Sequence, residues 1–363
     1  MKIPTSQAAG YDRKIVSAWP LSFAWIGLMQ FRVCLLLAFF AASVSPVLFA
    51  EEPAAVRIVF DTDMDSDCDD AGALAILHAL ADKGDLEILG TLVSSSHSWS
   101  GPCVDAINTY FGRPDLPIGV SKANSASRQG SKFAQQIAAE FPHDFPAGEA
   151  APDAIVVYRQ ILAAQPDDSV TIVTVGDLTN LRFLLESPAD ALSPLTGGQL
   201  VAAKVRQWVC MGSRYPADLD PQPWGNFKMD PKSTVKAIAD WPTTITFTGG
   251  GEFANSVATG KTLGTLPKDN PVRRVYELYF GGAARNRHSA DQITVMVAAN
   301  GAASPWKLVT AGHNKIFPNG THQWETEPDN PRHQYVSALI DPESAKEVAA
   351  EMETLMRHQP MDR

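Results

Sequence analysis

Cysteine is scarce in this chain, which has 4 among its 363 residues. Cys34 lies in a strongly apolar N-terminal run, so only Cys68, Cys103 and Cys210 remain for the rest of the chain. An odd number of cysteines does not make a disulfide framework, and at most one pair could close. Their apolar neighbours indicate small core residues instead.

Positive charge is also in short supply, with 30 Lys and Arg against 40 Asp and Glu and a net charge of −10. The first 50 residues carry four basic residues and one acidic residue, so the net charge without them is −13. A protein this acidic is poorly suited to a polyanion, which argues against nucleic acid as a partner. Internal repeats and low-complexity tracts are lacking too.

One long apolar run stands near the N-terminus, where residues 33–50 read VCLLLAFFAASVSPVLFA. Arg32 precedes this run and two glutamates follow it, which is typical of a secretory signal peptide cleaved near Ala50. Met29 would give a compact signal, so we expect translation to begin there. The alternative is an uncleaved membrane anchor. No Cys follows the run directly, which argues against a lipid anchor.

These features predict a leader over residues 1–50 and a single domain over residues 51–363. We expect a C-terminal extension from about residue 305 that packs on this domain, and we assign its His322, Trp324 and His333 to that packing. We also expect a periplasmic or secreted protein with no stable membrane anchor. Whether it forms a homo-oligomer stays open, because no interface is visible in the sequence.

Apolar strands alternate with amphipathic helices along the chain. The predicted strands cover residues 56–60, 86–95, 116–120, 169–176, 204–212 and 243–250, and the predicted helices cover residues 69–84, 104–112, 153–165, 179–187, 230–241 and 292–299. Residues 121–150 and 213–225 look irregular. This alternation predicts an α/β fold with an open, mostly parallel, Rossmann-like sheet and helices on both faces.

Six aspartates crowd into the ten positions that separate the first strand from the first helix. They are Asp61, Asp63, Asp65, Asp67, Asp69 and Asp70. Ligands of open α/β sheets bind at the carboxyl ends of the strands, where this cluster lies. The segments GDLTN (176–180) and MGSRYP (211–216), together with Asp291, should reach the same edge. Carboxylates this close repel one another unless a cation lies among them or some are protonated.

Two other kinds of site could explain part of this cluster. An EF-hand calcium loop needs Gly at its sixth position and Glu at its twelfth, but counting from Asp61 gives Ser66 and Gly72. A haloacid dehalogenase-type phosphatase also places Asp-x-Asp after a strand. That family needs Thr or Val where Asp65 stands, and its downstream Lys and acidic pair have no convincing equivalents here.

An ordered set of motifs resembles the nucleoside hydrolases, the inosine–uridine-preferring nucleoside N-ribohydrolases. The segment DTDMDSDCDDAGALA (61–75) is similar to the opening of a family branch with a longer loop. Further similar segments follow in the family's order: GTLVSSSHS (90–98), GRPDLPIGV (112–120), TVGDLTNLRFLL (174–185), VCMGS (209–213), WGNFKMDPKST (224–234) and SADQITVMVAA (289–299). The resemblance covers residues 56 to about 300 and implies the nucleoside hydrolase fold.

The resemblance also implies one calcium ion at the bottom of a pocket. Asp63, Asp70 and Asp291 would bind it through their carboxylates and Thr179 through its backbone carbonyl, a set of oxygen ligands that suits a hard cation. Asp63 would also be the general base that activates water. The register leaves Asp65 as an alternative first ligand, but Asp63 keeps the strand-end pair DTD intact.

The same resemblance implies a substrate-binding set. Asp69 would hold the ribose hydroxyls, with Asn226 as a further sugar contact. Trp224 stands where the family has Glu, and His97 stands where it has Asn, so both enter the substrate set with altered chemistry. For Asp67, two roles stay open: a contact to the metal through water, or simple solvation.

The position of the leaving-group histidine departs from the family pattern as well. Many members carry His directly before the last metal aspartate, whereas this chain has Ala290. His288 lies three residues before Asp291 and could substitute, or could be an ordinary loop residue. The prediction is an exported, calcium-dependent hydrolase that splits ribonucleosides into base and ribose. The alternatives are an inactive, calcium-stabilised binding protein and a hydrolase of another glycoside.

Overall fold

Eight strands form one sheet in the part of the chain that the computed structural model describes, which is residues 55–122, 130–215, 222–301 and 305–360. The strand order is β3-β2-β1-β4-β5-β6-β10-β7, and every pairing is parallel except the antiparallel pairing of β10 with β7. The strands are β1 (Val56–Thr62), β2 (Leu86–Val93), β3 (Ile118–Val120), β4 (Val170–Thr174), β5 (Val205–Arg214), β6 (Thr244–Gly250), β7 (Trp306–Val309) and β10 (His333–Leu339). The predicted open, mostly parallel sheet is confirmed. The leader predicted over residues 1–50 lies outside the described residues.

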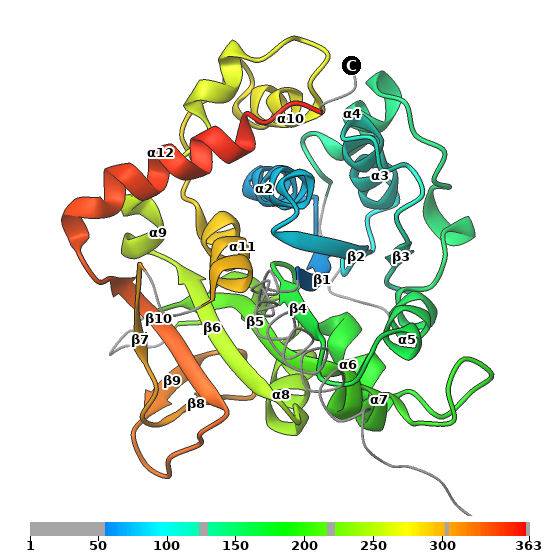
Figure 1. The fold of residues 1–363 in the computed structure, drawn as a ribbon, viewed down its shortest axis with the longest axis vertical. Helices are drawn as coiled ribbons and strands as arrows, with labels where there is room; N and C mark the ends of the chain where they lie inside the picture. The colour runs from blue at the N-terminus through cyan, green and yellow to red at the C-terminus, as the bar shows by residue number, and fades with distance from the viewer. Residues whose placement is uncertain (1–54, 123–129, 216–221, 302–304, 361–363) are drawn as a thin grey trace, which may run out of the picture. The chain divides into compact units, whose positions relative to one another are not determined.

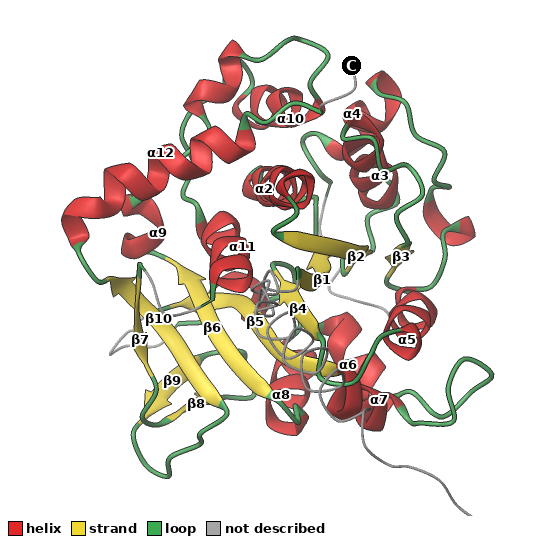
Figure 2. Cartoon of the chain, viewed as in Figure 1, coloured by secondary structure: helices red, strands yellow, loops and turns green. Residues whose placement is uncertain are grey.

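Helices cover both faces of this sheet (Figures 1 and 2). The α-helices are α2 (Asp69–Lys83), α3 (Ser100–Tyr110), α4 (Ala134–Glu140), α5 (Ala154–Ala164), α6 (Thr179–Glu186), α7 (Gly197–Lys204), α8 (Pro231–Asp240), α9 (Glu252–Ser256), α10 (Pro271–Phe280), α11 (Ala290–Asn300) and α12 (Ala345–Met356). Short 3₁₀ segments are η1 (Gly148–Ala150), η2 (Gly225–Lys228), η3 (Lys261–Thr265) and η4 (Pro342–Ser344). None of the helices among the described residues is long and apolar enough to cross a bilayer.

Strand β1 shows why the strand sequences are continuously apolar. Successive side chains of a strand point to opposite faces. Ile58 and Phe60 pack in the core shared with α2 and α11, while Val59 packs in the core shared with α5 and α6. All three side chains have 0% exposure. A strand buried on both faces therefore favours apolar residues at consecutive positions, as in Ile58, Val59 and Phe60.

Helix α2 begins directly after the aspartate cluster and ends in a glycine. Asp69 and Asp70 occupy its first turn, where carboxylates interact favourably with the helix N-terminus. Gly84 follows the last helical residue with φ +82°, and its N–H donates to the carbonyl of Ala81. A positive φ of this kind favours glycine, which explains the stop.

The region from about residue 305 supplies part of the sheet itself. Strand β10 lies between β6 and β7, and α12 contacts α2. A separate two-stranded hairpin, β8 (His313–Ile316) with β9 (His322–Glu325), precedes β10. The sequence predicted only a packed extension here and did not predict these strands. Helix α4 likewise lies in the segment 121–150, which was expected to be irregular.

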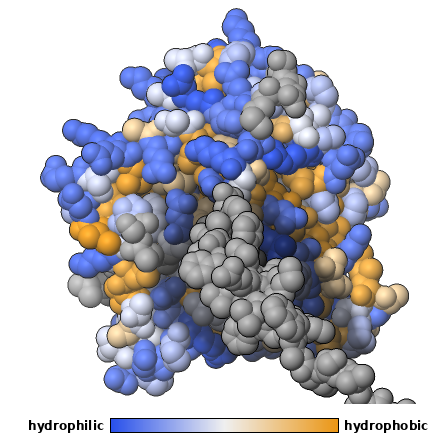
Figure 3. All heavy atoms as spheres, viewed as in Figure 1, coloured by the Kyte–Doolittle hydropathy of each residue, from blue (hydrophilic) through white to orange (hydrophobic). Residues whose placement is uncertain are grey.

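The core holds the cysteines, and the surface exposes few large apolar side chains. Cys68, Cys103 and Cys210 are buried free thiols, as their apolar neighbours indicated. On the face in Figure 3, hydrophilic side chains surround smaller hydrophobic areas. The large apolar side chains exposed among the described residues are Val156, Leu192 and Ile340. Single exposed apolar residues of this kind are normal on globular proteins.

Candidate functional site

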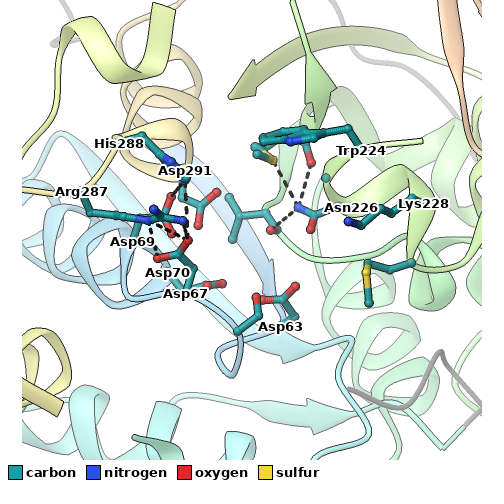
Figure 4. Close-up of a pocket in the computed structure, with 15 residues that line it drawn as sticks. Asp63, Asp67, Asp69, Asp70, Trp224, Asn226, Lys228, Arg287, His288 and Asp291 are labelled. Atoms are coloured by element: carbon teal, nitrogen blue, oxygen red, sulfur yellow. Dashed lines mark hydrogen bonds and ion pairs between the residues drawn. The ribbon is translucent and has the colours of Figure 1, made fainter. Parts of the chain in front are cut away.

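A cavity of about 480 Å³ opens at the carboxyl ends of the central strands (Figure 4). Five separate segments line it: the loop between β1 and α2, the residue after β4, the C-terminal half of β5, the η2 segment with the residues beside it, and the start of α11 with the loop before it. The lining residues are Asp63, Ser66, Asp67, Asp69, Asp70, Val175, Met211, Trp224, Gly225, Asn226, Lys228, Met229, Arg287, His288 and Asp291. The sheet edge predicted for a ligand site therefore carries a cavity.

Three carboxylates meet at the acidic wall of this cavity. Asp69, Asp70 and Asp291 each have an oxygen within 4.8 Å of the others, and each residue is at most 3% exposed. Burial, and then the charges of neighbouring aspartates, raise the pKa of Asp70 and Asp291 well above the usual range. Burial likewise raises the pKa of Asp69 to about 6. Buried carboxylates this close stay ionised together only with a cation among them.

Asp63 reaches the same cavity from the end of β1. Its neighbour Thr62 donates its hydroxyl to Asp70 Oδ1, and the N–H of Met64 lies 3.3 Å from the same oxygen. These bonds connect the end of β1 to the first turn of α2. Asp63 lies between Thr62 and Met64 in the sequence and lines the cavity. Asp65 instead accepts a hydrogen bond from the hydroxyl of Ser95 and is not among the lining residues. The placement therefore matches the register in which Asp63, rather than Asp65, serves the site.

Asn226 and Trp224 form the opposite wall with Lys228 (Figure 4). The Asn226 Nδ2 donates to the carbonyl oxygens of Val175 at 2.5 Å and Met211 at 3.2 Å. These two bonds fix the amide, and its Oδ1 is the remaining polar atom that can accept from a ligand. The Trp224 ring lies under the guanidinium of Arg214, with Cζ 4.9 Å from the ring centroid. This wall thus presents a flat aromatic surface beside a fixed amide.

A second pair of contacts stands beside the acidic wall. The guanidinium of Arg287 binds Asp67 through both carboxylate oxygens, with its Nε 3.0 Å from Oδ1 and 2.9 Å from Oδ2. His288 Nε2 lies 3.3 Å from Asp69 Oδ2. Burial alone would lower the pKa of His288, but the hydrogen bond and the charge of Asp69 outweigh it and raise that pKa. The imidazole is therefore biased towards its protonated form.

Comparison with known proteins finds similarity only at the level of structure. No family model and no curated protein sequence matches the chain. The inosine–uridine preferring nucleoside hydrolase of Bacillus anthracis superposes with a TM-score of 0.59 at 13% identity, covering 83% of this chain and 99% of that one. A plant nucleoside hydrolase gives 0.59 at 17% identity, covering 84% and 99%. The type III effector XopQ, solved with adenosine diphosphate ribose, gives 0.58 at 14% identity, covering 84% and 94%. The chain has the nucleoside hydrolase fold.

Within this nucleoside hydrolase fold, most of the predicted site residues come together. Asp63, Asp69, Asp70, Asp291, Trp224 and Asn226 all line the one cavity. The carboxylates that meet are those of Asp69, Asp70 and Asp291, whereas Asp63, predicted as a ligand, lines the same cavity outside this group. Three carboxylates form an oxygen donor set that fits a hard divalent cation better than zinc or copper, which favour nitrogen and sulfur ligands. The geometry can therefore hold a metal ion opposite an aromatic, amide-bearing wall.

Two predicted residues of the nucleoside hydrolase set lie outside the lining of the cavity. Thr179 is fully buried at the start of α6, where its hydroxyl donates to Asp230 Oδ2 at 2.9 Å. His97 is partly exposed, and its Nδ1 accepts from the N–H of Trp99 at 3.4 Å just before α3. Burial lowers the pKa of His97, which favours the neutral ring that this contact needs. Its backbone N–H also donates to the Ser95 hydroxyl at 3.1 Å, and that hydroxyl donates to Asp65 in the loop between β1 and α2.

The sequence reasoning missed Arg287 and Lys228 and left His288 undecided. Asp67 was expected to contact the metal through water or to be solvated, and the structure pairs it with Arg287 instead. The signal that could have found this pair is the run RNRHSAD (285–291), in which two cationic side chains precede the last metal aspartate. Asp61, the first aspartate of the cluster, is not among the lining residues; it is 1% exposed, and Tyr158 donates its hydroxyl to Oδ2 at 2.8 Å.

Proposed function

We propose that this protein is a metal-dependent N-glycoside hydrolase that cleaves ribonucleosides into base and pentose, with calcium as its metal. The observation that carries the proposal is a cavity in which the carboxylates of Asp70 and Asp291 meet, with Asp69 within 4.8 Å of both and Asp63 in the lining. The nucleoside hydrolase fold and the ordered sequence motifs support the same reading. The cavity, about 480 Å³, is of a size that suits a small-molecule ligand.

The acidic wall would hold the metal and activate water, and both walls would contact the sugar. Asp70 and Asp291, with Asp63, would hold the calcium ion, which supplies positive charge that acidifies a nearby water. Asp63 would take the proton from the attacking water. Hydrolysis at C1′ of the ribosyl group would then pass through an oxocarbenium-like transition state, as in other glycosidases. Asn226 Oδ1 would accept a hydrogen bond from a sugar hydroxyl, and Asp69 would accept from another.

Departure of the base requires a proton that Ala290 cannot supply. His288 lines the cavity with its Nε2 3.3 Å from Asp69 Oδ2, and its pKa is raised by that carboxylate. We assign it the role of donating a proton to the leaving base, with Trp224 stacking on the base from the opposite wall. We also propose that the protein is exported, because the apolar run 33–50 has the pattern of a secretory signal.

The test is pentose release by the chain from Glu51 with a panel of purine and pyrimidine nucleosides, in calcium and in chelator. Because XopQ was solved with adenosine diphosphate ribose, ribosyl compounds that carry phosphate belong in the panel. Wild-type release that Asp63→Ala and Asp291→Ala abolish would support the hydrolase. Asp167→Ala is the matched control, because Asp167 is an exposed aspartate that pairs with Lys204 away from the cavity.

The second candidate is a binding protein that kept the pocket and lost turnover, which the changes at Trp224 and Ala290 favour. Calcium titration by calorimetry separates the two. Calcium binding without release from any compound in the panel would favour the binding protein, while the absence of both would exclude the metal site. Export is tested separately by expressing the full chain and sequencing the N-terminus of the mature protein, which should begin at Glu51.

A further inference from the structure

The β8–β9 hairpin packs against two aromatic residues near the cavity wall formed by Trp224, Asn226 and Lys228. The His322 ring in β9 lies 4.7 Å from the Tyr215 ring and 5.7 Å from the Phe227 ring, measured between centroids. Tyr215 directly follows β5, and Phe227 belongs to η2. Within the stretch between these two aromatic residues, positions 216–221 lie outside the described residues, and Trp224 and Asn226 line the cavity. The buried His322 ring therefore contacts Phe227, which directly follows Asn226, and Tyr215, which directly follows the Arg214 that lies over the Trp224 ring.

Hydrogen bonds hold His322 in this place. His322 Nδ1 lies 2.9 Å from Asn314 Oδ1, and Asn314 Nδ2 donates to the Tyr215 hydroxyl at 2.6 Å. Because an amide oxygen only accepts, Nδ1 of His322 carries the proton in this arrangement. The backbone N–H of Asn314 donates to His333 Nδ1 at 3.2 Å, which anchors the hairpin to β10. His322, Asn314 and Tyr215 are each at most 4% exposed, so losing one partner would leave buried polar groups unsatisfied.

The turn of the hairpin also touches η2 directly. Gly320 has φ +83°, and a Cβ added there would stand 2.5 Å from the carbonyl oxygen of Phe227 and 3.1 Å from Cα of Lys228. Only glycine permits both this backbone conformation and this close approach. The turn therefore presses against the backbone of the residue that follows Asn226, on the outer side of the cavity wall.

We propose that His322 is a positioning residue for this wall, acting through Tyr215 and Phe227 on Trp224 and Asn226. The expected effect on KM rests on the proposed function, whereas the expected effect on the order of the wall does not. The wall holds substrate in both the ground state and the transition state, so a displaced wall weakens binding more than it slows the chemical step. The acidic wall belongs to other segments, β1, α2 and α11, so calcium binding does not depend on the hairpin.

The experiment compares His322→Leu with His313→Leu. His313 lies in the same hairpin, with its Nε2 3.8 Å from Glu325 Oε2. Hydrogen–deuterium exchange of peptides covering 222–230 measures the order of the wall without needing turnover. We expect faster exchange there in His322→Leu alone. With an active substrate, KM should rise about fivefold or more while kcat stays within about twofold, and calcium affinity should stay unchanged. His322→Asn keeps a donor near Nδ1 without the ring, and it should show a smaller effect of the same kind.

Exchange over 222–230 in the His322 variants decides whether His322 positions the wall. Unchanged exchange over 222–230 in a folded His322→Leu protein overturns the proposal, whatever the activity. If that variant does not fold, His322→Asn decides by the same measurement. Faster exchange with no turnover of any nucleoside by the wild type supports the positioning role and counts against the hydrolase. Equal loss of calcium affinity and activity would mean general destabilisation and would overturn the proposal.

Discussion

Arg287 binds the carboxylate of Asp67 across a sequence separation of 220 residues, with Nε 2.9 Å from Oδ2. The same guanidinium lies 5.5 Å from the centroid of the Tyr279 ring. The pair joins the loop after β1 to the loop before α11, and Asp69, Asp70 and Asp291 stand at the ends of those loops. Arg287 therefore supplies a fixed positive charge beside the acidic wall whether or not a metal is bound.

Replacing Arg287 should destabilise the metal-free protein, because its positive charge offsets the repulsion between the carboxylates of Asp67 and Asp69. In Arg287→Met the mostly buried Asp67 loses its guanidinium partner and keeps the Cys68 N–H and His288 Nε2 at 3.7 Å. The free energy of unfolding in chelator should therefore fall by about 1–3 kcal/mol. Calcium affinity should rise, because a neighbouring positive charge is gone. Urea denaturation and calcium titration measure the two effects. Arg182→Met, which removes a partly exposed pair with Glu186, is the control and should cost less than about 0.5 kcal/mol. Equal stability of the two variants would contradict the assignment.

Asp61 should make the metal-free protein less stable as pH rises. Burial raises the pKa of this carboxyl from 3.8 to about 7, against the hydrogen bonds from Tyr158 and Asn180 that lower it. The folded state then keeps a proton that the unfolded chain has lost. The stability contribution is complete below pH 3.8, declines as pH rises through about 7, and is constant above that.

The matching variant is Asp61→Asn, which keeps an acceptor for Tyr158 and cannot titrate. The free energy of unfolding, measured by urea in chelator between pH 5 and about 8, should fall less steeply in this variant than in the wild type. Asp69, Asp70 and Asp291 have raised pKa values and contribute with the same sign, so part of the slope remains. Identical slopes for wild type and variant would show that Asp61 does not titrate in this range.

Local hydrophobic patterns in the sequence were enough to predict the buried strands and helices of the core. Strand β1 is apolar on both faces and α2 carries apolar residues at helical spacing, so both could be read directly. Strands β7, β8 and β9 have four residues each and are only partly buried, so they depend on pairing partners that no local pattern reveals. The position of β10 between β6 and β7 likewise depends on tertiary packing and cannot be predicted from a local pattern.

The candidate site divides in the same way. Asp63, Asp69, Asp70 and Asp291 were predictable because each stands at a strand end or helix start, where chain topology brings them together. The Arg287–Asp67 pair was not, because it joins two loops whose approach follows only from the assembled sheet. For His97, motif position predicts a substrate contact, and the structure places it outside the lining of the cavity, with its Nδ1 accepting from the N–H of Trp99 just before α3.

Trp224 should contribute to binding through its ring. Base–aromatic stacking contributes about 1–3 kcal/mol per base, so Trp224→Ala should raise KM about tenfold with little change in kcat. Trp224→Phe keeps an aromatic face and should stay close to the wild type. Steady-state kinetics on the best nucleoside of the panel measures both. A fall in kcat at unchanged KM in Trp224→Ala would mean that the indole acts on the chemical step and not on binding.

His288 can be tested by changing the leaving group instead of the enzyme alone. A purine leaves readily only when it is protonated, so His288→Ala should lower kcat on a purine nucleoside by about 100-fold or more. Nitrophenolate leaves without a proton, so hydrolysis of p-nitrophenyl riboside by the same variant should stay close to the wild-type rate. His97→Ala is the matched control, because His97 lies outside the lining of the cavity, and both substrates should be unaffected. If His288→Ala slows both substrates equally, the imidazole serves to hold Asp69 or the sugar, and the proton for the base comes from another group.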